Sequence, residues 1–200
     1  MIVKLLHNTP LSVCSYAIRT CYQSHSKSDN GGPIDCDLID RVGNKNRHSS
    51  TLEHLVYTFS IDGISRACLQ ELARHRIASY SVKSTRYTLK ELKDTNTCEL
   101  EKFLIDDIDP VVKSSALDSL RNIKTLLNLP NAKMDVIKYA LPECYKTSLT
   151  WTINARSLQN FLSLRTSKAA LKEIRELALK VFDILPEDHK FIFVDCIAKD

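Results

Sequence analysis

The stretch CYKTSLTWTINARSLQNFLSLR, residues 144–165, places two kinds of secondary structure directly after one another. Residues 144–154 predict a strand, and residues 155–165 predict a helix. A longer helix is expected over residues 167–185, where Pro186 closes it. A strand that leads straight into long helices indicates a chain of mixed α and β structure.

The rest of the chain also mixes helices with a few strands. Thr9 is expected to cap the first helix, with Pro10 at its first position. Asp109 and Pro110 mark in the same way the start of an amphipathic helix. We expect strands at residues 1–6 and 53–62, helices at 9–24, 34–47, 64–76, 109–129 and 132–141, a turn at Gly63, a mobile loop at 24–33 and another loop at 77–87.

Size and composition fit one globular domain. At 200 residues the chain is long enough for one good-sized domain and short for two. Apolar residues make up 44% and charged residues 26%, an ordinary globular balance that argues against disorder. Because no repeat or boundary interrupts the pattern, we expect a single domain over residues 1–200, of the α/β (α+β) class.

Charge and cysteine content narrow the class of function. A net charge of +4 suits binding of an anionic small molecule and is lower than the charge expected of a dedicated nucleic-acid-binding protein. No apolar run reaches the roughly 18 residues of a membrane span, and the N-terminus is unlike a signal peptide. The seven cysteines form no CxxC pair, so we expect reduced, buried thiols in a cytoplasmic protein and no metal site.

The segment ARHRIASYSVKSTRYT, residues 73–88, combines adjacent cations with hydroxyl groups. We expect its Arg-His-Arg triplet at the C-terminal end of a helix, where the helix dipole favours cations. Arginine binds phosphate through two parallel hydrogen bonds, so the segment predicts an anion site. The alternative interpretation of the same composition is a solvated basic loop.

Three motifs together resemble the flavin-dependent thymidylate synthases. That family's signature is Arg-His-Arg, seven variable residues and Ser, then one residue, Arg and Tyr; RHRIASYSVKSTRY matches it at residues 74–87. HSSTLEHLVYTF, residues 48–59, is similar to the family's upstream element. WTINARSLQNFLSLR, residues 151–165, is similar to its Asn-Ala-Arg-Ser-Leu helix.

The resemblance implies an enzyme and its ligands. Such an enzyme methylates dUMP to dTMP, takes the carbon from methylenetetrahydrofolate, and takes the hydride from FAD that NADPH has reduced. It implies a small, mainly antiparallel sheet with long helices, a homotetramer with shared active sites, and no partner among nucleic acids or membranes. It also implies no cysteine nucleophile. The alternative from another class is a small basic RNA- or DNA-binding module.

The resemblance also assigns roles to individual residues. Glu53 is interpreted either as a structural cap or as a flavin contact. Val82 is an implied cofactor contact, at a position where relatives often have Glu or Gln. The other implied cofactor contacts are His48, Ser50, Arg74, His75, Arg76, Asn154, Arg156 and Asn160.

The substrate contacts implied by the resemblance surround a phosphate and a uracil ring. Arg165 matches the arginine that lies against the uracil and favours its anionic form, which makes it the catalytic candidate. Lys138 stands where relatives often have an arginine that reaches the substrate phosphate. Glu71 stands where relatives often have a glutamine, and the neighbouring Gln70 can take over that role. The implied substrate set is Gln70, Glu71, Arg74, Ser84, Thr85, Arg86, Lys138 and Arg165. Outside these sets, we expect Trp151 in the core or at an interface rather than as a stacking platform, and His25 and His189 in solvent.

Overall fold

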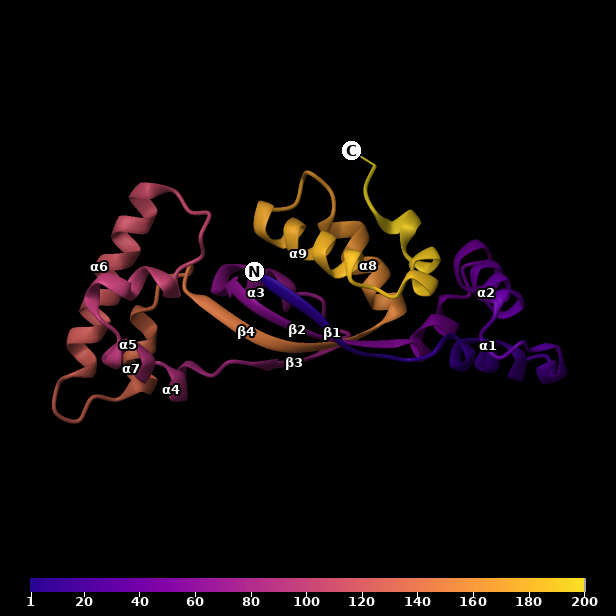
Figure 1. Cartoon of the computed structure of the whole chain (residues 1–200), viewed down its shortest axis with the longest axis horizontal. Coiled ribbons are helices and arrows are strands. Elements are labelled where there is room, and N and C mark those ends of the chain that lie inside the picture. Colours follow the sequence, from indigo (N-terminus) through magenta and orange to yellow (C-terminus); the bar gives the residue numbers. More distant parts are fainter. Residues whose placement is uncertain (200) are drawn as a thin grey trace. The chain divides into compact units, whose positions relative to one another are not determined.

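The computed structural model describes residues 1–199, which contain one four-stranded sheet and several helices (Figure 1). The sheet order is β1-β2-β4-β3. The strands are β1 (Ile2–Asn8), β2 (Val56–Ser65), β3 (Ala78–Val82) and β4 (Lys146–Asn154). The helices are α1 (Leu11–Thr20), α2 (Pro33–Ile39), α3 (Arg66–Leu72), α4 (Thr85–Thr88), α5 (Lys90–Asp94), α6 (Pro110–Leu127), α7 (Met134–Ile137), α8 (Ala155–Arg165) and α9 (Lys172–Asp183).

Contacts within the chain define two compact units. Unit 1 contains residues 1–61, 72–80 and 150 to the last described residue, and unit 2 contains residues 62–71 and 81–149. Strands β2, β3 and β4 each contribute residues to both units. The mixed class with a small antiparallel sheet is confirmed, and the single domain over residues 1–200 stays a prediction.

Aromatic side chains from two strands and α8 build the core of unit 1. Tyr57 and Phe59 are fully buried on β2, and Trp151 is fully buried on β4, as the sequence predicts. The Trp151 ring lies 5.7 Å from Phe59 and 5.0 Å from Phe161 of α8 between ring centroids. Burial of side chains this large typically stabilises a fold by about 1.5–3 kcal/mol each. These contacts fix α8 against the strands (Figure 1).

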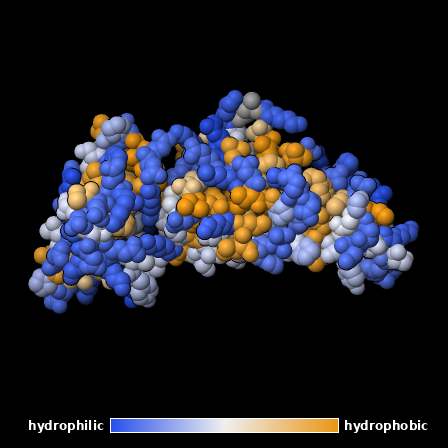
Figure 2. All heavy atoms as spheres, viewed as in Figure 1, coloured by the Kyte–Doolittle hydropathy of each residue, from blue (hydrophilic) through white to orange (hydrophobic). Residues whose placement is uncertain are grey.

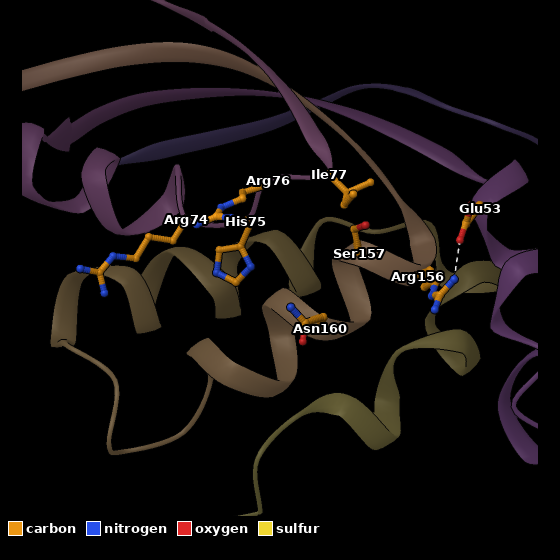
Figure 3. A pocket seen from close by; sticks show the side chains of 8 residues that line it. All are labelled: Glu53, Arg74, His75, Arg76, Ile77, Arg156, Ser157 and Asn160. Atoms are coloured by element: carbon orange, nitrogen blue, oxygen red, sulfur yellow. Dashed lines mark hydrogen bonds and ion pairs between the residues drawn. The ribbon is translucent and has the colours of Figure 1, made fainter.

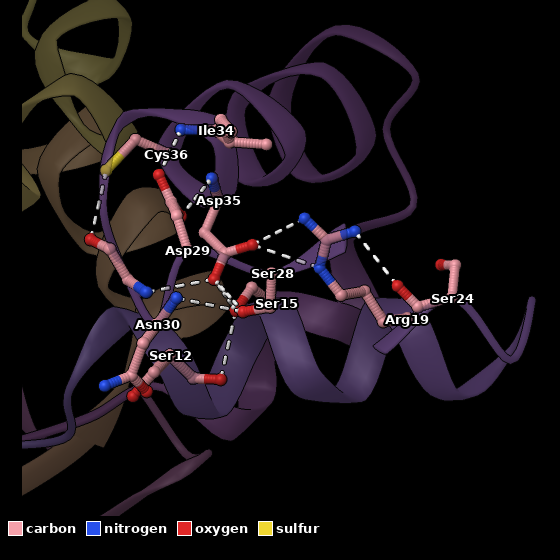
Figure 4. A network of polar contacts seen from close by, with 11 residues as sticks. Ser12, Ser15, Arg19, Ser24, Ser28, Asp29, Asn30, Ile34, Asp35 and Cys36 are labelled. Atoms are coloured by element: carbon pink, nitrogen blue, oxygen red, sulfur yellow. Dashed lines mark hydrogen bonds and ion pairs between the residues drawn. The ribbon is translucent and has the colours of Figure 1, made fainter. Parts of the chain in front are cut away.

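A buried carboxylate organises the N-terminal part of unit 1 (Figure 4). Asp35 Oδ1 accepts from Arg19 Nη2 and Nε at 2.6 and 3.0 Å. Asp35 Oδ2 accepts from Ser15 and Ser28 hydroxyls and from the Gly31 N–H, at 2.8, 2.6 and 2.9 Å. Burial opposes ionisation of Asp35, but these donors outweigh it and lower its pKa to about 2. The carboxylate is therefore charged at neutral pH.

Unit 2 is built around the longest helix of the described chain. Asp109 caps α6, because its carboxylate accepts from the N–H groups of Val111 and Val112 at 2.8 and 3.3 Å, as the sequence predicts. The apolar face of α6 packs against α5 and the segment that follows it. The buried residues of this second core are Leu89, Leu92, Leu100, Leu104, Ala116, Leu120, Ile123, Leu127, Ile137 and Tyr145.

The segment around the arginine triplet differs from expectation. Strand β2 runs through Gly63, at φ 76°, to Ser65, so no turn separates it from α3. Helix α3 ends at Leu72, and the triplet follows it rather than closing it. The loop expected at residues 77–87 contains β3 and the single turn α4. The sequence does not indicate β3 as a strand, because β3 lies at the edge of the sheet and its polar side chains lack an apolar pattern.

Three smaller expectations were also wrong. Thr9 does not cap α1; it pairs with the start of β2, donating its N–H to Val56 O at 2.9 Å, and Pro10 is the cap residue. Cys21 and Cys98 are exposed, although all seven cysteines are free thiols. His189 is 2% exposed, and its Nδ1 shares a 2.7 Å hydrogen bond with the Tyr57 hydroxyl.

Two other expectations concern the N-terminal part and the membrane. The polar segment at residues 24–33, expected as a mobile loop, contains a 3-10 turn and supplies two of the donors to Asp35. His25, expected in solvent, is only partly exposed, and its ring packs on Tyr16 at 4.3 Å. Over residues 1–199, no helix combines the length and hydrophobicity needed to cross a membrane.

Replacing Asp35 with Ala is expected to lower the free energy of unfolding by about 3–5 kcal/mol, because it leaves the Arg19 guanidinium buried without its counter-charge. Urea unfolding measures the change. Asp118→Ala is the control, since Asp118 forms an exposed pair with Arg121 that is worth about 0–1 kcal/mol. Equal stability of the two variants would contradict the structural role of Asp35.

Candidate functional site

A cavity of about 580 Å³ in unit 1 collects the predicted cofactor residues (Figure 3). Three segments far apart in sequence form it: the 3-10 helix η3 (Ser49–His54), the arginine triplet after α3, and the first turns of α8. The lining residues are Glu53, Arg74, His75, Arg76, Ile77, Arg156, Ser157 and Asn160.

The junction between β4 and α8 brings the helix to the cavity. Asn154 ends β4 and caps α8, because its side-chain oxygen accepts from the Ser157 N–H at 2.8 Å. The Ala155 N–H donates to Leu55 O at 2.8 Å, which ties the start of α8 to the end of η3. Arg156 and Asn160 are four residues apart and therefore lie on one face of the helix.

Cations dominate the lining of this cavity. Three arginines, Arg74, Arg76 and Arg156, line it together with one carboxylate, that of Glu53. Arg156 Nη1 donates to Glu53 Oε1 at 2.6 Å, although the two residues are 103 positions apart. Both side chains are about half exposed, at 55% and 46%, so this pair adds little stability. Its consequence is geometric: the pair joins η3 to the first turn of α8 and holds the Arg156 side chain at the Glu53 end of the cavity (Figure 3).

His75 is the buried member of the triplet, whereas Arg74 and Arg76 are exposed. Arg165 Nε donates to His75 Nε2 at 3.2 Å. The imidazole also packs edge-to-face on Phe161, with centroids 5.0 Å apart. The triplet therefore divides into two exposed cations and one ring directed at α8.

A second cavity of about 1000 Å³ shares Arg156 and Asn160 with the first. Its remaining walls come from the π-helix Asp40–Lys45, from Arg47 and Ser49, from later positions of α8 and from residues 191–196. Gln159 fastens two of these walls together, donating to Asn44 Oδ1 at 2.9 Å and to Ile192 O at 2.8 Å. The shared residues make the two cavities neighbours.

Of the predicted substrate set, Arg74 and Arg165 lie in unit 1 and the other six residues lie in unit 2. Ser84 is the cap residue of the short α4, and Thr85 and Arg86 are its first two residues. Arg86 Nε lies 3.2 Å from Asp135 Oδ2 of α7. Lys138 follows α7 and its ammonium lies 5.6 Å from the Tyr139 ring.

Gln70 and Glu71 also lie in unit 2. Gln70 Nε2 donates to Glu143 Oε2 at 2.9 Å. Glu71 is partly buried, and the structure leaves its assignment a prediction.

Six of the predicted cofactor residues meet in the first cavity: Glu53, Arg74, His75, Arg76, Arg156 and Asn160. Asn154 instead caps α8, and His48, Ser50 and Val82 are exposed outside the lining of both cavities. Ile77 and Ser157 were missed by sequence reasoning. Their proximity to the triplet and to Arg156 in the chain was the available signal.

Metal binding is not indicated. Among the described residues, no group of three or more His, Cys, Asp or Glu side chains is arranged to hold an ion. The first cavity offers three guanidinium groups, an amide, an imidazole, a hydroxyl and one carboxylate, and its excess of cations suits an anionic ligand.

Comparison with known proteins identifies the family. The family model described as thymidylate synthase complementing protein matches residues 4–189. The flavin-dependent thymidylate synthases of Wolinella succinogenes and Campylobacter jejuni are 57% and 56% identical, over 96% and 100% of this chain and 97% and 99% of theirs. A crystal structure of thymidylate synthase X from Helicobacter pylori with FAD and dUMP superposes with a TM-score of 0.92 at 51% identity, covering 98% of this chain and 99% of that one. The chain belongs to the flavin-dependent thymidylate synthase family.

Proposed function

We propose that this protein converts dUMP to dTMP by reductive methylation, with FAD as cofactor, methylenetetrahydrofolate as carbon donor and NADPH as reductant. The observation that carries the proposal is the cavity of Figure 3, in which six residues of the family pattern line one space. Family membership over the whole chain supports the same reaction. Nothing in the comparisons supports the nucleic-acid-binding alternative.

The charge and the polar groups of the first cavity suit FAD. Arg74 and Arg76 offer exposed guanidinium groups that suit the two phosphates of the cofactor. Asn160 and Ser157 add amide and hydroxyl groups that can bind the edge of a flavin ring, and Ile77 adds an apolar surface. When bound and reduced, FAD supplies the hydride; the protein binds and orients it and excludes water.

We make two separate assignments for dUMP: Ser84, Thr85, Arg86 and Lys138 of unit 2 as contacts to its phosphate, and Arg165 of unit 1 as a contact to its uracil ring; in the proposed homotetramer the two can come from different subunits. The unit 2 residues supply two hydroxyls, a guanidinium and an ammonium, which are the groups that bind a phosphate monoester. Arginine is a permanently charged side chain in proteins. Beside a uracil ring, Arg165 would therefore stabilise the negative charge that develops as the pyrimidine attacks the one-carbon unit.

We assign the co-substrates to the second cavity. Its volume of about 1000 Å³ is in the range of sites for large organic ligands. Its wall contains Lys45, Arg47 and Arg156 together with Asp40 and Asp195, and Lys45 Nζ is paired with Asp40 Oδ2 at 2.6 Å. Arg47 and Arg156 are therefore the cations that suit the anionic groups of NADPH and a folate. Because it shares two residues with the first cavity, a co-substrate bound there would approach the flavin.

Three thiols of this chain are poor candidates for a nucleophile. Burial raises the pKa of Cys14 to about 12, and it also raises the pKa of Cys144 and Cys196. A thiol with a raised pKa is rarely ionised at neutral pH, and the thiolate is the attacking form. This favours a reaction without a covalent bond between a cysteine and the pyrimidine.

We also propose a homotetramer in the cytoplasm. Unit 1 exposes large apolar side chains on the outer face of β1 and on α1, and Figure 2 shows hydrophobic atoms, in orange, reaching the surface in several places. Ile2 and Leu6 of β1 are each 58% exposed, and Tyr16 of α1 is 64% exposed. Such surfaces are typical of faces that another subunit covers. The free cysteines agree with a reducing compartment.

Replacing Arg74 or Arg76 with Ala is expected to weaken FAD binding by about 10- to 100-fold, because each loses charged hydrogen bonds to phosphate. The flavin absorbance of the folded, purified variants and a titration with added FAD measure the loss. Arg121→Ala is the matched control, since Arg121 is an exposed arginine on α6. Variants that keep a full complement of FAD would overturn the assignment of the first cavity.

Replacing Arg165 with Ala should leave FAD binding intact but reduce thymidylate formation by about 100- to 1000-fold, the typical cost of one preorganised donor at a developing charge. Arg165→Lys should recover part of the rate, since lysine keeps the charge without the planar fork. Flavin content and dUMP affinity are compared in the same preparations. Lost flavin with unchanged dUMP affinity would move Arg165 to the cofactor.

A further inference from the structure

We propose that His75 is a positioning residue for Arg165: its imidazole accepts the Arg165 Nε–H and so sets the direction of the guanidinium plane. The inference deepens the proposed function and rests on the assignment of Arg165 to the substrate. It separates His75 from Arg74 and Arg76, whose exposed side chains are suited to the phosphates of the cofactor.

The contact between the two side chains is close and sheltered. Arg165 Nε lies 3.2 Å from His75 Nε2, and the two residues are 90 positions apart in sequence. His75 is 8% exposed, and Arg165 is partly buried at the end of α8. A hydrogen bond shielded from water holds its geometry better than one on the surface.

The chemistry of the two groups fixes the state of the imidazole. An arginine Nε–H can only donate, so the nitrogen opposite it must accept. The imidazole accepts at Nε2 only when it is neutral and carries its proton on Nδ1. An imidazolium would donate from both nitrogens and would repel the guanidinium.

The surroundings hold the imidazole in place. The His75 N–H donates to Leu72 O at 3.1 Å, and the Tyr80 hydroxyl lies within donating distance of both His75 O, at 2.6 Å, and Leu72 O, at 2.9 Å. The ring itself packs edge-to-face on Phe161, at an interplanar angle of 84°. Phe161 and Arg165 are four residues apart on α8, so one ring meets two side chains on the same face of the helix.

Fixing Nε fixes the rest of the guanidinium. The group is planar, so the direction of the Nε–H determines where the two terminal nitrogens point. An arginine side chain otherwise loses substantial rotamer freedom when it binds a ligand, and ordering it beforehand reduces that cost. A held Arg165 therefore presents its terminal nitrogens in one geometry before the substrate arrives.

Two conservative substitutions separate this role from simple packing. The amide oxygen of Gln reaches about the position of imidazole Nε2, whereas the shorter Asn reaches about that of Nδ1. At saturating FAD, we expect His75→Asn to lower dUMP affinity and turnover by about 10- to 100-fold, the range for losing a hydrogen bond to a charged group. His75→Gln, which keeps an acceptor for Arg165, should recover most of that loss. Equal behaviour of the two variants would overturn the proposal.

A double-mutant cycle tests whether His75 acts through Arg165. If it does, the combination of His75→Asn with Arg165→Ala should be no slower than Arg165→Ala alone, because coupled residues are non-additive. Multiplied losses would overturn the inference. An impaired Arg165→Ala beside an unimpaired His75→Asn would overturn only this inference. An unimpaired Arg165→Ala would overturn the role of Arg165 in the proposed function as well.

Discussion

The direct passage from β4 into α8 is the constraint on which the cofactor cavity depends. The Asn154 cap and the hydrogen bond from Ala155 N–H to Leu55 O fix where the helix begins, at 2.8 Å each. Burial of Phe161 fixes its rotation about its own axis. Because successive residues of an α-helix are about 100° apart, these constraints leave Arg156 and Asn160 on the cavity side. A start displaced by one residue would turn both away.

The same helix connects two chemical tasks. Its first turns offer Arg156 and Asn160 to the cavity assigned to FAD, and its last residue is Arg165. Between them, Phe161 packs on both Trp151 and His75, at 5.0 Å in each case. The aromatic core therefore positions the polar residues of α8. The packing that stabilises unit 1 also sets the spacing between the cofactor residues and the arginine assigned to the substrate.

Sequence reasoning succeeded where a pattern is local. The strand-to-helix passage at residues 144–165 and the Asp109 cap of α6 are written in adjacent residues, and both are confirmed. It failed at β3, because an edge strand with polar side chains lacks an apolar pattern. It failed at His189 too, since the Tyr57 hydroxyl that allows its burial is 132 positions away.

The candidate site shows the same division. The motif match identified the triplet, Arg156 and Asn160, and these residues meet in one cavity. The sequence could not predict which of these residues contact one another, because the contacts join residues about a hundred positions apart: Glu53 with Arg156, and His75 with Arg165. A one-dimensional pattern indicates which residue types a ligand requires; the fold decides which of them restrain one another.

Hydrogen–deuterium exchange of the flavin-free protein, with and without FAD, tests most directly whether this cavity holds the cofactor. The account predicts slower amide exchange on FAD addition in three segments: residues 49–54, residues 74–77 and the first turns of α8. Unchanged exchange in all three, with protection confined to other parts of the chain, would contradict it.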